Sequence, residues 1–182
     1  SKENADKEQK RSFKREVFSW IACIVVTILL TEFILNFVII NANIPSGSME
    51  NTIMTNDKLI ALRTSYWFND PKRGDIIIFK YPDDETEWFI KRVIALPGET
   101  VLVKDGKVYI NGSKKALSEP YIKEEPVEDF GPYKVPKNGY FVMGDNRNNS
   151  NDAREWETHY VSRDEVLGKA WFRYYPSIKV IK

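Results

Sequence analysis

Two serines, Ser46 and Ser48, flank Gly47 in the segment Asn41-Ala-Asn-Ile-Pro-Ser-Gly-Ser-Met49. A serine hydroxyl can attack a carbonyl carbon once a neighbouring base removes its proton, so this small, hydroxyl-rich segment is a candidate site for a nucleophile. Eight residues separate Ser48 from Ile40, which ends a long apolar run. An extended chain spans at most ~3.6 Å per residue, so Ser48 would lie within roughly 30 Å of that run.

The base that would activate this serine is unlike that of most serine nucleophiles, because we do not expect a histidine in this role. The chain has one histidine, His159, in a stretch without a companion motif, and we interpret it as incidental. A neutral lysine can also act as the base. Lys91 lies in a strand-like run, where it would share one face with Phe89 and Val93 while Arg92 points to the other. Burial on such a face lowers a lysine pKa, although most lysines in strands are solvated.

A third group of polar residues follows a predicted strand, in Gly144-Asp-Asn-Arg-Asn-Asn-Ser-Asn-Asp-Ala-Arg154. Two aspartate-to-arginine spacings of two residues, together with a serine, favour an ordered, hydrogen-bonded loop over a plain polar loop. The residues concerned are Asp145, Arg147, Ser150, Asp152 and Arg154.

Composition excludes several other kinds of chemistry. The chain has one cysteine, Cys23, and one histidine, so we expect no disulfide within the chain and no metal site built from these residues. No glycine-rich phosphate loop occurs, and we expect no cofactor. After position 40 the chain has 21 basic and 21 acidic residues, and this balance gives no indication of nucleic-acid binding.

The elements that must position these residues begin with an apolar run. Residues 18–40 form a run of 23 residues with one charge, Glu32, which predicts a transmembrane helix rather than a buried core helix. Residues 1–17 carry six basic and four acidic side chains, which predicts a cytoplasmic N-terminus and an extracytoplasmic remainder. Glu32 is either protonated or snorkelling, or it contacts another membrane helix together with Asn36.

Residues 41–182 predict one mainly β domain of packed antiparallel sheets. Short apolar runs rich in β-branched and aromatic residues are separated by glycine and proline, and Asp105-Gly106 predicts a hairpin turn. Residues 111–138 hold four of the nine prolines and predict an irregular excursion or a small subdomain. Residues 162–165 match a capping box. Strands are expected at residues 57–64, 74–81, 88–96, 101–104, 107–110, 139–143 and 170–175.

Taken together and in order, four stretches resemble the bacterial type I signal peptidases, which are membrane-bound serine proteases with a Ser/Lys dyad. The single anchor and short excursion resemble the smaller Gram-positive or cyanobacterial members. The matching stretches are residues 44–53 (Ile-Pro-Ser-Gly-Ser-Met-Glu-Asn-Thr-Ile), 73–79 (Arg-Gly-Asp-Ile-Ile-Ile-Phe), 90–98 (Ile-Lys-Arg-Val-Ile-Ala-Leu-Pro-Gly) and 144–154.

The resemblance implies a role for each matching residue and a fold of coiled antiparallel β-sheets behind a single anchor. It implies that Ser48 is the nucleophile, Lys91 the general base, Ser46 a contributor to the oxyanion hole, and Ser150 the hydroxyl that orients the lysine. Walls of the substrate cleft would be Ile44, Pro45, Met49, Ile53, Phe89 and Ile90. Support for the polar loop would come from Gly144, Asp145, Arg147, Asp152 and Arg154.

The function expected from this resemblance is removal of signal peptides from exported preproteins at the membrane. Two alternatives remain open. One is a Ser/Lys protease dedicated to a narrower substrate, such as a pilin or a conjugation factor. The other is a non-catalytic anchored β-domain, which the presence of both Ser48 and Lys91 disfavours.

Overall fold

The computed structural model describes residues 2–182, which the division between Val38 and Ile39 separates into two units along the sequence. The first unit is helix α1 (Lys2–Phe33) followed by the short π-helical segment η1 (Ile34–Val38). No proline or glycine precedes Pro45, so nothing in this stretch interrupts a helix. Thr27 and Thr31 each donate a hydroxyl hydrogen bond to the carbonyl four residues earlier, which satisfies these hydroxyls within the helix itself.

One helical segment among residues 2–182, Asp6–Val38, is long and apolar enough to cross a membrane by its length and composition. Large apolar side chains along it, such as Trp20 and Leu29, are exposed. Asn36 donates hydrogen bonds to the carboxylate and the carbonyl of Glu32, so this glutamate has a partner on its own helix. The predicted apolar run extended to Ile40, but the helical segments end at Val38 and residues 39–40 begin strand β1.

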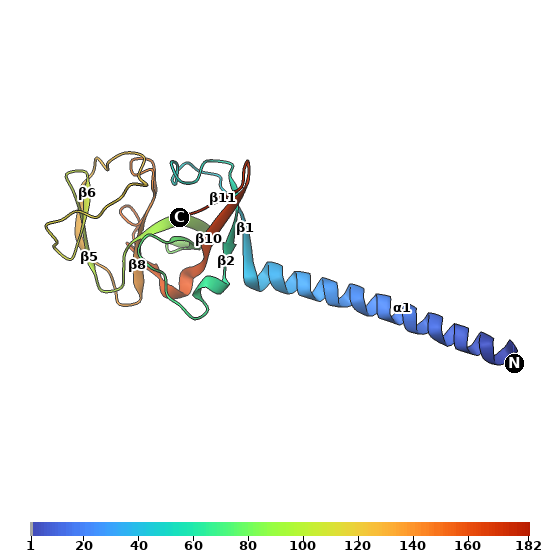
Figure 1. Cartoon of the computed structure of the whole chain (residues 1–182). Helices are drawn as coiled ribbons and strands as arrows, with labels where there is room; N and C mark the ends of the chain where they lie inside the picture. Colours follow the sequence, from blue (N-terminus) through green and yellow to red (C-terminus); the bar gives the residue numbers. More distant parts are fainter. Residues whose placement is uncertain (1) are drawn as a thin grey trace. The chain divides into compact units, whose positions relative to one another are not determined.

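The second unit is built on a large antiparallel sheet with the order β1-β2-β10-β3-β4-β8-β9, to which β11 adds by pairing with β10 (Figure 1). Its strands are β1 (Ile39–Asn43), β2 (Lys58–Leu62), β3 (Ile76–Tyr81), β4 (Asp84–Ala95), β8 (Gly139–Met143), β9 (Val161–Ser162), β10 (Val166–Tyr175) and β11 (Lys179–Val180). Short 3-10 turns η2 (Thr64–Tyr66) and η3 (Arg163–Glu165) join them, and η3 begins with the predicted capping box at Ser162.

A second, smaller sheet has the order β6-β5-β7, from β5 (Thr100–Lys104), β6 (Lys107–Ile110) and β7 (Phe130–Lys134). The predicted hairpin is confirmed, because Asp105 and Gly106 both have positive φ angles, 50° and 75°, as a type I′ turn requires. Strand β7 lies within the predicted irregular excursion and pairs with β5, so that excursion contributes one edge of a sheet. Figure 1 shows β5 and β6 at one side of the domain and β1, β2 and β10 at the other.

Two apolar clusters form the core of the β domain. One includes Phe79, Val93 and Phe141, and the other gathers residues of β2 and β3 around Met49 and Ile53. Strand β4 pairs with β3 on one side and β8 on the other, and its last five residues are all buried. Because side chains alternate between the faces of a strand, β4 can present polar groups to two different buried environments.

Candidate active site

Ser48 stands in a tight turn directly after Gly47. The amides of Thr52 and Ile53 donate to the Met49 carbonyl at 3.1 and 2.9 Å, and the Glu50 amide donates to the Gly47 carbonyl at 3.1 Å. A Cβ atom at Gly47 would lie 2.7 Å from the Glu50 carboxylate, so a larger residue would crowd this turn. The turn holds the Ser48 side chain nearly buried, at 6 % exposure.

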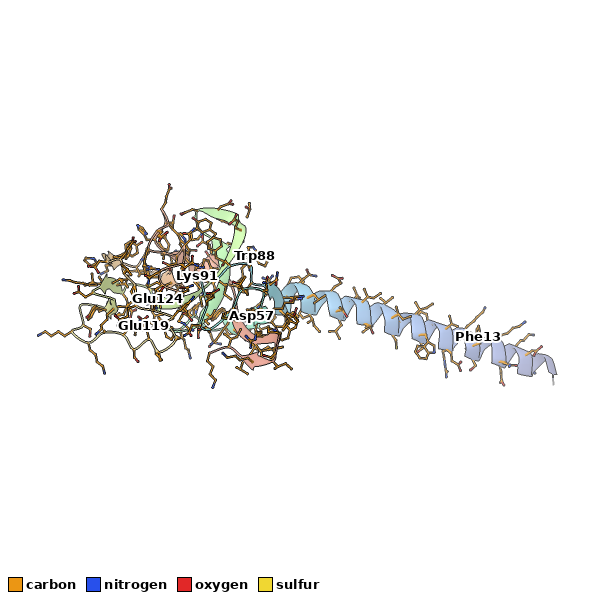
Figure 2. All side chains as sticks on the ribbon, turned by 90° about the horizontal axis from the view of Figure 1, so that it is seen from above. Phe13, Asp57, Trp88, Lys91, Glu119 and Glu124 are labelled. Atoms are coloured by element: carbon orange, nitrogen blue, oxygen red, sulfur yellow. The ribbon has the colours of Figure 1, made fainter. Side chains whose placement is uncertain are left out.

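Lys91, in the buried half of β4, brings its amine to this serine. Its Nζ lies 2.9 Å from Ser48 Oγ and 3.1 Å from the Ile90 carbonyl, and the residue is 4 % exposed. The Phe89 ring centroid lies 5.2 Å from the same nitrogen. Burial lowers the pKa of Lys91 from 10.5 to about 8, and the nearby Asp152 carboxylate opposes this shift by favouring the charged amine. Lys91 and Trp88 from the same strand are both marked in Figure 2.

Ser46 lies on the other side of the nucleophile turn. Its hydroxyl oxygen is 3.5 Å from Ser48 Oγ, so both hydroxyls face one region. That region is a cleft of about 520 Å³ whose lining joins the nucleophile turn, the outer half of β4 and the polar loop. The lining residues are Pro45, Ser46, Gly47, Ser48, Glu87, Trp88, Phe89, Ile90, Lys91, Asn149 and Asn151.

The predicted cleft walls divide into two groups. Pro45, Phe89 and Ile90 line the cleft and also a smaller hollow of about 190 Å³, to which Ile44 contributes. Met49 and Ile53 are fully buried in the core and line neither of these two hollows. Both side chains therefore belong to the core of the domain rather than to the lining of these hollows.

The polar loop is held against the nucleophile turn through Gly144. Its amide donates to Asp152 Oδ2 at 2.9 Å, and its carbonyl accepts from Arg147 Nε at 3.0 Å. A Cβ atom at position 144 would collide with both the Ser150 hydroxyl and the Ser48 carbonyl, so glycine permits this close approach. Arg154 pairs with Asp152 at 2.8 Å and also donates to the Arg147 carbonyl. The loop is therefore ordered, as its sequence indicated.

Ser150 is buried beside Gly144, and its hydroxyl has no hydrogen-bond partner within residues 2–182. The structure thus brings Ser150 to the site, close to the backbone of Ser48, while its predicted action on Lys91 stays a prediction.

Several residues of the site had no local sequence signal. Arg92, expected to point away from Lys91, is fully buried and forms two hydrogen bonds with Asp145, at 2.8 and 2.7 Å. Its guanidinium also lies 3.9 Å from the ring centroid of Tyr121. Arg147 pairs in the same two-bond manner with Glu119, at 2.9 and 2.7 Å. Asp145 and Arg147 therefore find their partners outside their own loop, 53 and 28 residues away.

His159 contacts the Ala153 carbonyl through Nδ1 at 2.7 Å and packs edge-on against Phe130 and Tyr133. No group of three or more residues able to hold a metal ion occurs among residues 2–182. A serine with a buried amine of lowered pKa at 2.9 Å, facing an open cleft, has the geometry that a serine hydrolase with a lysine base requires.

Comparison with known proteins is consistent with this class. The family model of signal peptidases, peptidase S26, matches residues 17–175. The chain is 44% identical over 161 residues to a probable signal peptidase I-2 of Synechocystis, covering 86% of this chain and 72% of that protein. It is 34% identical over 185 residues to signal peptidase I of Bacillus amyloliquefaciens, covering 96% of this chain and 97% of that protein.

A crystal structure of a signal peptidase I from Enterococcus faecalis aligns with a TM-score of 0.48 and 36% sequence identity, covering 56% of this chain and 97% of that one. On the family match and these identities, the chain belongs to the signal peptidase family, peptidase S26, and is an endopeptidase that cleaves signal peptides.

Proposed function

We propose that Ser48 and Lys91 cleave signal peptides from exported preproteins, with Ser48 as the nucleophile and neutral Lys91 as the general base. The observation that carries this proposal is the 2.9 Å approach of the two groups in a buried site, where the lysine pKa falls to about 8. At pH 7 a lysine of that pKa is neutral in roughly one molecule in eleven, against roughly one in three thousand at its ordinary value.

The reaction follows from these positions. As Ser48 Oγ bonds to the scissile carbonyl carbon, its proton passes to Lys91 Nζ. The carbonyl oxygen becomes an oxyanion, for which the Ser46 hydroxyl and the Ser48 backbone amide are the proposed donors. Lys91 then returns its proton to the leaving amine, and an acyl ester forms on Ser48. Lys91 then takes a proton from a water molecule that attacks the ester carbonyl, and it passes this proton to Ser48 Oγ as the ester bond breaks, which restores both groups.

The cleft suits a substrate with small side chains near the cut. Its apolar lining comes from Pro45, Trp88, Phe89 and Ile90, and the smaller hollow beside it, of about 190 Å³, shares these four residues. Signal peptides carry small residues at the cleavage site. Shallow pockets reject bulky side chains by steric clash, whereas each extra methylene in a matching pocket changes the binding energy by only ~1–3 kcal/mol.

The helix supports a place at the membrane. We propose that residues 18–40 contain the anchor, that residues 1–17 lie on the cytoplasmic side and that residues 41–182 form the extracytoplasmic catalytic domain. Basic residues before the apolar run favour this orientation. Enzyme and substrate would then both be held at one surface, which raises their effective concentration. Contact of Glu32 with another membrane helix, shared with Asn36, remains part of the proposal, and a protonated or snorkelling Glu32 is the alternative; Asn36 donates a hydrogen bond to its carboxylate.

The test is cleavage of a labelled preprotein by the full chain in detergent, with the cut mapped by mass spectrometry. The proposal predicts one cut after the small-residue motif, and none with Ser48→Ala. A cut elsewhere, or cleavage only of a dedicated substrate such as a pilin, would favour the narrower protease. Undiminished cleavage by Ser48→Ala would remove the proposed nucleophile.

A further inference from the structure

Asn146 holds the backbone on both sides of the nucleophile. Its side-chain Nδ2 donates to the Gly47 carbonyl at 2.9 Å, and its own backbone amide donates to the Ser48 carbonyl at 3.0 Å. Because a carbonyl oxygen only accepts, the nitrogen of the Asn146 carboxamide must be the atom that faces Gly47. The residue is 3 % exposed and reaches across 99 residues of sequence to the nucleophile turn.

The first of these two bonds acts on a peptide group with a special role. The Gly47 carbonyl and the Ser48 N–H belong to the same peptide unit, which is planar and trans. In such a unit the C=O and N–H bonds point in opposite directions. Fixing the direction of the Gly47 carbonyl therefore fixes the direction of the Ser48 N–H, with no free torsion between them.

That N–H is available for the reaction. Among residues 2–182 it has no hydrogen-bond acceptor, and both Gly47 and Ser48 line the cleft. The Gly47 carbonyl also accepts from the Glu50 amide, but this donor belongs to the same turn and moves with it. Asn146 is the donor to this carbonyl that ties the peptide to a separate part of the domain.

Asn146 is itself held rigidly. The Asn149 amide donates to its carbonyl at 3.0 Å. Neighbouring Gly144 is fixed through its amide by Asp152 and through its carbonyl by Arg147, whose side chain is buried. Stabilisation of an oxyanion depends on donors that are already oriented before reaction, because a mobile donor must be reorganised in the transition state.

We propose that Asn146 is a positioning residue that orients the peptide between Gly47 and Ser48, so that the Ser48 N–H is held toward the oxyanion. This inference rests on the proposed serine mechanism. Asn146 stabilises the transition state through the peptide and does not act on Lys91. Its loss should therefore lower kcat while leaving KM and the dependence of rate on pH unchanged.

The test compares Asn146→Ala and Asn146→Asp in the full chain, with a labelled preprotein in detergent. Asparagine and aspartate have the same size, but an aspartate accepts where this site needs a donor. We expect each substitution to lower kcat by about 10- to 100-fold, somewhat less than removal of an oxyanion donor itself, with KM within about threefold of the parent. In Asn146→Ala, which adds no charge beside Lys91, the acid limb of the rate profile should keep its inflection.

Asn148→Ala is the matched control, because this neighbouring carboxamide also donates to a backbone carbonyl, that of Glu125, far in sequence from the nucleophile turn. It should cleave at the parental rate. Rates are normalised to the folded fraction from thermal denaturation, so that a partly unfolded variant is still informative. A second test combines Asn146→Ala with Ser46→Ala, where two effects on one oxyanion should be less than additive.

Parental kcat in Asn146→Asp, a loss confined to KM, or a shift in the acid limb of the uncharged Asn146→Ala would each overturn the inference. Ser48→Ala separates this failure from failure of the mechanism. If Ser48→Ala is inactive while Asn146→Asp is fully active, only the role of Asn146 is wrong. If Ser48→Ala cleaves normally, the serine mechanism itself fails.

Discussion

The rate of cleavage should report the ionisation of Lys91. With a pKa of about 8, the neutral fraction of this lysine rises from roughly 9 % at pH 7 to roughly 91 % at pH 9, so kcat/KM should rise about tenfold. If the base were an exposed lysine with a pKa of 10.5, the cleavage rate would still rise steeply with pH at pH 9. An inflection near pH 8 would therefore show that burial lowers the pKa of Lys91.

A substitution of Asp152 tests the cause of this pKa. Its carboxylate favours the charged amine and opposes the effect of burial. Asp152→Asn removes that charge and leaves Arg154 without its ion pair, and both changes disfavour a second positive charge nearby. The Lys91 pKa should fall further, and the acid limb should move to lower pH, even if the plateau rate drops because the Gly144 amide loses a charged acceptor.

The assay is initial-rate cleavage of a labelled preprotein from pH 5.5 to 10 in detergent, each variant being normalised to its own plateau. Tryptophan fluorescence at each pH confirms that the protein stays folded. A limb that moves to higher pH in Asp152→Asn would refute the electrostatic reasoning. A parental rate that is flat between pH 6 and 9 would refute lysine as the base.

Three further predictions concern stability and the oxyanion hole. Lys91→Met should abolish cleavage. It should also raise the free energy of unfolding at pH 7, measured in urea titrations, by up to about 3 kcal/mol. The reason is that the buried amine is charged below pH 8, where its lowered pKa means that the charge destabilises the folded state. That gain should shrink as the pH rises from 8 toward 10.5, and a constant gain would contradict it. Ser46→Ala should lower kcat by about 10²–10³ with KM little changed, and Ser46→Thr should lose less; parental kcat in Ser46→Ala would make Ser46 only a turn residue. Gly144→Ala should cost about 1–3 kcal/mol in urea unfolding and slow cleavage, because its Cβ meets Ser150 and Ser48, and unchanged stability would show that the loop can move aside.

Features set by neighbouring residues could be predicted from the sequence. The hairpin at Asp105-Gly106 and the capping box at Ser162 depend on local backbone geometry, and both are confirmed. The mainly β fold follows from the short runs of β-branched and aromatic residues, and most expected strands lie within a few residues of the observed ones. The sequence does not locate the end of the helix within the apolar run, because Ile39 and Ile40 suit a strand as well as a helix.

The polar network of the site could not be predicted in this way. The sequence places Arg92 on the opposite face of β4 from Lys91 but does not indicate its partner, and the structure buries Arg92 against Asp145. Glu119 bonds to Arg147, 28 residues away, and Asn146 bonds to Gly47, 99 residues away. A periodic pattern of residues in the sequence does not predict contacts between residues so far apart. Met49 resembled a cleft wall because of its motif, whereas the turn after Ser48 directs it into the core.

The central claim is that Ser48 and Lys91 act as one catalytic unit, and kinetics of the two single variants and the double variant test it most directly. Ser48→Ala, Lys91→Ala and the double substitution are each incubated with labelled preprotein at pH 9, where the parental lysine is mostly neutral. All three should show the same residual rate, since groups that act as a unit lose their effect together. Appreciable turnover by Lys91→Ala, or a double variant slower than both single variants, would contradict the dyad.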